Sequence, residues 1–148
     1  MPFTCPISFK LLSTEAFGNL DHSVMASDFA THKELGRLAD EEIYQGDFSA
    51  RLSQAGFKTY REVPVTVSFG SFSKVYSLDV VIDERAVYEL KAVVRLTSDH
   101  AGQLINYLCL VEAERGKLVN FRPASVESKF VNAPLSRQHR QRDRKSVV

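Results

Sequence analysis

The 148-residue sequence contains only two cysteines, and they lie far apart, at Cys5 and Cys109. Neither belongs to a C-x-x-C pair, so the sequence offers neither a disulfide framework nor the cysteine ligands of a zinc or iron–sulfur site. A metal ion bound to this chain would therefore be held by oxygen ligands.

The sequence also lacks an apolar run of about 18 residues, the length that a membrane-spanning helix needs. Its first 20 residues have neither the basic start nor the apolar stretch of a secretion signal. We therefore expect a cytoplasmic protein without a membrane partner. Because 44% of the residues are hydrophobic and ten residues are Phe, the chain can bury the core of one globular domain.

The net charge is only +1, but it is unevenly distributed. Residues 137–148, RQHRQRDRKSVV, carry a charge of +4, which leaves 17 acidic residues against 14 Lys and Arg, or −3, in the remainder. This tail has few apolar side chains, so we expect it to be disordered. Two roles stay open for it: non-specific binding to a phosphate backbone, or none beyond solvation.

The pattern of apolar residues predicts an α/β fold, with helices packed on a mixed sheet. Residues 1–20 show no clear period, and we expect them to be mostly irregular. Helices are expected at about 21–36, 38–55 and 98–114. Strands are expected at 57–67, 75–82, 86–96 and 117–121, and residues 122–130 form either an edge strand or an irregular segment.

Three charged residues interrupt the two apolar strands of the expected hairpin VYSLDVVIDERAVYELKAVV, residues 75–94. Glu89 and Lys91 are two residues apart and so share one face of their strand. An antiparallel pairing brings Asp79 across from Glu89. Charges are not expected among Val and Leu without a reason. A surface salt bridge and a buried ion-pair cluster are the simple alternatives to a functional site.

Two helices supply further polar side chains. Glu41 lies three residues before Tyr44 and seven before Phe48, which predicts that it points inward and needs a cation or metal as partner. On the third helix, Gln103 and Tyr107 are one turn apart; a surface amide and a core aromatic are the ordinary interpretations. Two carboxylates can hold Mg²⁺ and a lysine can position a water molecule, a combination suited to phosphodiester hydrolysis.

The D-x(9)-E-x-K pattern, with the upstream Glu41 and the downstream Q-x-x-x-Y, resembles the PD-(D/E)XK nuclease superfamily, including its RecB-like branch. Over about residues 20–130 the sequence looks like one small group, the GxxExxY proteins. Its matching blocks are HKELG (32–36), ExxY (41–44), REVPV (61–65), LDVVID (78–83), YELKAV (88–93), QLINYL (103–108) and LVNF (118–121). Family members carry a second glycine where this chain has Leu38.

The resemblance implies a restriction-endonuclease-like core, with a mixed central sheet flanked by helices, over residues 21–136. It implies Asp79, Glu89 and Glu41 as ligands of Mg²⁺ or Mn²⁺. Lys91 would be the catalytic lysine.

The resemblance further implies that Gln103 and Tyr107 bind the substrate, a nucleic acid, with DNA favoured over RNA. The alternative is a nuclease-fold binding or assembly module that is inactive alone or needs a protein partner or a homodimer. The slightly acidic folded part favours this alternative, since a nuclease acting alone should attract polyanions.

Overall fold

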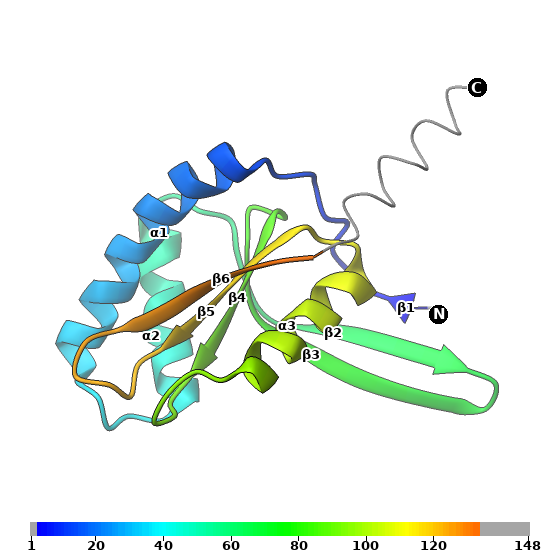
Figure 1. The fold of residues 1–148 in the computed structure, drawn as a ribbon. Coiled ribbons are helices and arrows are strands. Elements are labelled where there is room, and N and C mark those ends of the chain that lie inside the picture. Colours follow the sequence, from blue (N-terminus) through cyan, green and yellow to red (C-terminus); the bar gives the residue numbers. More distant parts are fainter. Residues whose placement is uncertain (1–2, 134–148) are drawn as a thin grey trace.

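The computed structural model describes residues 3–133, so the basic tail expected at 137–148 lies outside the described residues. They form the predicted α/β fold, a mixed sheet with helices on both faces (Figure 1). The elements are β1 (Phe3–Thr4), α1 (Thr14–Leu35), α2 (Glu41–Gln54), β2 (Thr59–Phe69), β3 (Phe72–Ile82), β4 (Ala86–Lys91), α3 (Ser98–Val111), β5 (Arg115–Asn120) and β6 (Glu127–Asn132). None of these helices is both long enough and apolar enough to cross a membrane.

The six strands lie in the sheet in chain order, β1 to β6. Neighbouring strands are antiparallel except β4 and β5, which are parallel. A parallel pair needs a crossover connection, and α3 provides it. The carboxyl ends of β4 and β5 therefore meet at one edge, where Lys91 is the register partner of Asn120.

Two apolar layers hold the helices to the sheet. On one face, α1 and α2 bury Val24, Tyr44, Phe48 and Leu52. On the other face, α3 buries Leu104, Leu108 and Val111, which are spaced three and four residues apart. This helix packs closely because Gly116 has no side chain: a Cβ there would lie 3.0 Å from the Val87 carbonyl oxygen and 3.2 Å from the Leu104 side chain.

The start of α1 differs from the prediction, because residues 14–20 are helical rather than irregular. The helix begins at Thr14 since Ser13 caps it, its hydroxyl oxygen accepting a hydrogen bond from the Ala16 amide at 3.1 Å. The expected end is confirmed: the helix closes at Gly36, whose amide donates to the His32 carbonyl. The buried face of the helix extends back to Phe17, which packs in the same apolar layer as Val24.

The strand expected to run to residue 96 stops at Lys91. The Asn120 side chain holds the following segment in place. Its Nδ2 donates to the Val93 backbone carbonyl at 2.8 Å, and its Oδ1 accepts from the Val93 backbone amide at 3.0 Å. Of the two readings for residues 122–130, the edge strand is found, but only from Glu127 onward. Strand β2 lies two residues later than predicted, and β3 begins three residues earlier. Together they project beyond the sheet as a hairpin (Figure 1).

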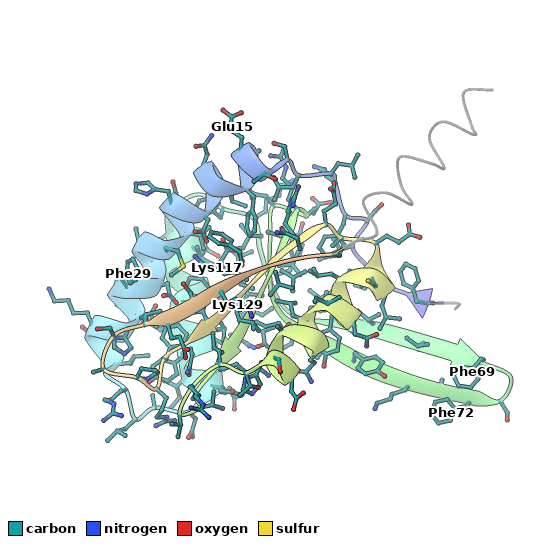
Figure 2. The ribbon with its side chains drawn as sticks, in the orientation of Figure 1. Glu15, Phe29, Phe69, Phe72, Lys117 and Lys129 are labelled. Carbon is teal, nitrogen blue, oxygen red and sulfur yellow. The ribbon has the colours of Figure 1, made fainter. Side chains whose placement is uncertain are left out.

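A buried polar cluster lies between α1 and the sheet (Figure 2). The Lys117 ammonium donates to both Asp21 carboxylate oxygens, at 2.8 and 3.0 Å, and the Tyr88 hydroxyl donates to Asp21 Oδ1 at 2.7 Å. Nearby, Asp28 is fully buried, and neither of its carboxyl oxygens has a hydrogen-bond partner among residues 3–133. Burial raises the pKa of Asp28 to about 7, against the opposing charge of Lys117.

Asp28→Asn should remove one source of pH dependence from the stability of the protein. The folded pKa of Asp28 lies above its unfolded value of 3.8, so its contribution to the unfolding free energy falls as pH rises from about 4 to about 7. The slope is about 1.4 kcal/mol per pH unit, or about 2 kcal/mol between pH 5 and pH 6.5. Urea unfolding should show that the unfolding free energy of the variant, relative to that of wild type, is higher at pH 6.5 than at pH 5 by this amount. The same difference at both pH values would contradict the raised pKa of Asp28.

Candidate active site

The candidate site lies at a fork between β3 and β4. These strands pair from Ile82 and Ala86 to Val80 and Tyr88, and then separate. Asp79 and Glu89 are the next residues along. The Glu89 carboxylate accepts a hydrogen bond from the Asp79 amide at 3.0 Å, and the Asp79 carboxylate accepts one from the Leu90 amide at 2.8 Å. Two side chains thus replace the backbone bonds where the ladder ends, and both acids are held at this point.

The backbone around Asp79 is irregular. Leu78 and Val80 would share a face in a regular strand, yet Leu78 packs in the α3 layer and Val80 in the layer of α1 and α2. Across the β2–β3 ladder Glu62 has a positive φ of 49°, and neither it nor Asp79 has a register partner. The strand therefore changes face at Asp79, at the root of the projecting hairpin.

Removal from water raises the pKa of both carboxyl groups. Glu89 is 4% exposed, and burial, followed by the charge of Asp79, raises its pKa well above the usual value. Burial also raises the pKa of Asp79, although the Leu90 amide counteracts it. In the part of the chain that the structure describes, neither carboxylate has a Lys, Arg or His nitrogen within 4.0 Å. The surface salt bridge, one of the alternatives to a functional site, is not formed in the described residues.

Lys91 lies on the same strand as Glu89 and faces α3, as the two-residue spacing predicts. Its ammonium donates to the Gln103 side-chain oxygen at 3.1 Å. Tyr107, one turn farther along α3, is partly buried, and burial together with the nearby charges of Glu89 and Asp79 raises its pKa. The structure therefore brings the β4 residues together with both predicted α3 residues.

The prediction for Glu41 is only partly correct. The side chain is exposed rather than inward, because Glu41 is the first residue of α2, before the helix meets the sheet. Its carboxylate nevertheless accepts a hydrogen bond from the Ala92 amide at 3.2 Å, just after Lys91. Glu41 therefore lies at the margin of the site and not in its interior.

The three acids do not form a ready-made metal cage, since residues 3–133 contain no group of three or more His, Cys, Asp or Glu side chains placed to hold a metal ion. The paired carboxylates of Asp79 and Glu89 still fit Mg²⁺. This ion takes oxygen ligands, and in phosphoryl-transfer sites one or two carboxylates suffice because water and phosphate oxygens complete the coordination.

Sequence reasoning missed Tyr76, whose ring centroid lies 5.5 Å from that of Tyr107. The available signal was its position on β3, two residues before Leu78, which predicts that it shares the face turned toward α3. Asn120 is the last residue of β5, and its role in holding the segment after Lys91 depends on contacts that the sequence does not show.

Comparison with known proteins identifies the superfamily of this chain. A family model described as the PD-(D/E)XK nuclease superfamily matches residues 18–131, and the chain belongs to that superfamily. A solved structure titled "Crystal structure of SSO0001" is 22% identical, with a TM-score of 0.49, over 78% of this chain and 68% of the other. No curated protein matches the chain.

Proposed function

We propose that this protein is a metal-dependent nuclease that hydrolyses phosphodiester bonds, with DNA as the favoured substrate, through a domain spanning residues 21–136. The observation that carries the proposal is the carboxylate pair of the buried Glu89 and the partly buried Asp79, which lack a cationic partner in the described residues, while Lys91 lies two residues after Glu89 on the same strand face. Buried charges need a partner, and a divalent cation is the partner that two hard oxygen ligands select.

Each side chain has a separate role in this proposal. Asp79 and Glu89 hold Mg²⁺ or Mn²⁺, with Glu41 contributing from the margin of the site. When bound, the ion stabilises negative charge on a phosphate and lowers the pKa of a bound water. Lys91 orients the attacking water, and Gln103 holds the lysine through the 3.1 Å hydrogen bond.

The finer family assignment is also a proposal. The contact between Lys91 and Gln103 supports placing the chain in the RecB-like branch, since it gives the Q-x-x-x-Y motif a direct link to the lysine. The ordered sequence blocks support the GxxExxY group within it. Tyr107 lies on the same side and is suited to contacting the substrate.

The test compares cleavage of single- and double-stranded DNA and RNA with Mg²⁺, with Mn²⁺ and with EDTA. Wild type should cut only with metal, and Asp79→Asn should abolish cutting and weaken calorimetric Mg²⁺ binding at least about tenfold, as expected when a ligand or its support is lost. Glu42→Gln, on the exposed start of α2, is the control and should behave like wild type.

Cleavage that does not depend on metal would contradict the nuclease proposal. Equal cleavage by wild type and Asp79→Asn would contradict it as well. Retained metal binding without cleavage, together with a stable protein complex, would instead favour the assembly module. The charge of −3 outside the tail is the observation that keeps this second function under test.

A further inference from the structure

The β2–β3 hairpin carries two exposed aromatic rings at its free end. Figure 2 shows Phe69 and Phe72 beside the turn, far from the helices. Each is 55% exposed, and their ring centroids lie 5.2 Å apart. Gly70 forms the turn with a φ of 59°, which glycine adopts without strain. The chain thus displays a pair of large apolar rings in solvent, where an isolated fold gains nothing from them.

A row of side chains connects this tip with the candidate site. Phe72, Lys74 and Tyr76 alternate along β3 and share one face. The Lys74 ammonium lies 4.9 Å from the Tyr76 ring centroid, and Tyr76 lies 5.5 Å from Tyr107.

Tyr107 is one helical turn from Gln103, which accepts a hydrogen bond from Lys91. We call Phe69, Phe72, Lys74, Tyr76 and Tyr107 the aromatic track. It extends from the hairpin tip to the part of α3 that carries Gln103, the hydrogen-bond partner of Lys91.

The charge of the hairpin is suited to a polyanion. Residues 63–78 contain no carboxylate, and Lys74 is their single charged side chain. The hairpin also carries hydroxyl donors suited to phosphate oxygens, at Thr66, Ser68, Ser71, Ser73 and Ser77. The rest of the chain before the tail is net acidic, so this segment is electrostatically distinct from the body that it leaves.

We infer that the aromatic track binds a single-stranded segment of nucleic acid, with unpaired bases stacked on its rings, and delivers the strand to the fork at Asp79 and Glu89. The inference rests on the proposed function for its direction toward the site. Rings interleaved with a cation are the usual surface for unpaired bases, because every base has a face that stacks.

The length of the track is appropriate to such a strand. Seven residues separate Phe72 from Asp79, or about 23 Å of extended strand, which corresponds to about seven stacked nucleotides. Known single-strand sites cover about 4–16 nucleotides. A duplex offers no free base faces to these rings, so the surface should discriminate against it.

The test measures binding of a fluorescent single-stranded DNA of about 16 nucleotides, and of the matching duplex, in EDTA so that cleavage does not interfere. Phe69→Ser with Phe72→Ser should weaken single-strand binding at least about fivefold and leave duplex binding unchanged. Phe69→Leu with Phe72→Leu should lose most of the same affinity, because leucine keeps the apolar surface and lacks the ring. Lys74→Gln should lower the salt slope by about 0.7.

The matched control is Phe29→Ser, because Phe29 is 56% exposed on α1, away from the hairpin (Figure 2), and its loss should leave binding unchanged. Equal single-strand affinity in wild type and the Ser variant would overturn the inference. The inference would also be overturned if the Ser substitutions abolished a dimer of the wild-type protein and left nucleic-acid binding unchanged. If the Ser variant loses single-strand binding but wild type never cleaves, the aromatic track is supported and the nuclease proposal is refuted. If wild type cleaves and the Ser variant binds single strands normally, the nuclease proposal stands and the aromatic track is refuted.

Discussion

Lys91→Ala is expected to lower the rate of Mg²⁺-dependent cleavage by about 10²–10⁴-fold, the usual contribution of a positioned proton-transfer group. The lysine is placed by β4 beside the Asp79 and Glu89 carboxylates, and its ammonium is held by Gln103 at 3.1 Å. Alanine removes the group that would orient the attacking water but leaves both carboxylates in place. Single-turnover cleavage at saturating enzyme measures this loss directly.

The stability of Lys91→Ala should stay close to that of wild type, since the side chain is only partly buried. Mg²⁺ affinity should be retained or increased because a nearby positive charge is removed. Lys129→Ala, on the exposed part of β6 (Figure 2), is the matched control and should cut normally. An active Lys91→Ala enzyme would contradict the role given to this lysine.

Lys117→Met is expected to lower the free energy of unfolding by about 3–5 kcal/mol, the cost of leaving one partner of a buried ion pair unpaired. Lys117 is 4% exposed and Asp21 is 7% exposed, so water cannot replace the lost ammonium. The variant also loses the contact in which the Lys117 ammonium lies 4.2 Å from the Phe130 ring centroid. Urea unfolding at neutral pH measures the difference.

A second variant separates the ion pair from simple loss of packing. Adding Asp21→Asn to Lys117→Met removes the stranded charge and should recover part of the lost stability. The hydrogen bond from Tyr88 to this position should still form in the double variant. A double variant that is less stable than Lys117→Met alone would show that Asp21 is not destabilised by losing the lysine.

Local periodicity was sufficient to predict several parts of this protein. The two-residue spacing placed Glu89 and Lys91 on one strand face. The structure confirms this, because Lys91 contacts Gln103 of α3 whereas Tyr88 and Leu90 pack in the layer of α1 and α2. The start of α3 near residue 98 is also found, where Thr97 and His100 form a capping box and His100 accepts from the Thr97 amide at 3.0 Å. These features depend on neighbours in sequence, so the residues alone are sufficient to indicate them.

The long-range features could not be read in the same way. Helical spacing predicted an inward Glu41, but the side chain is exposed because the register of α2 against the sheet decides which turn is covered. Nothing in the composition of α1 indicates that Asp28 is buried without a hydrogen-bond partner in the described residues. Burial depends on which elements pack together, and that choice involves residues far apart in the chain.

The sequence by itself determined the α/β class, the types of residue at the site and their spacing along β3, β4 and α3. The tertiary structure decided three further features. They are the fork at which the Asp79 and Glu89 carboxylates accept hydrogen bonds from backbone amides, the hydrogen bond from Lys91 to Gln103, and the hairpin that projects beyond the sheet. The reason is physical. Alternation along one strand sets the direction of a side chain, whereas the point at which two strands separate depends on the packing of the whole sheet.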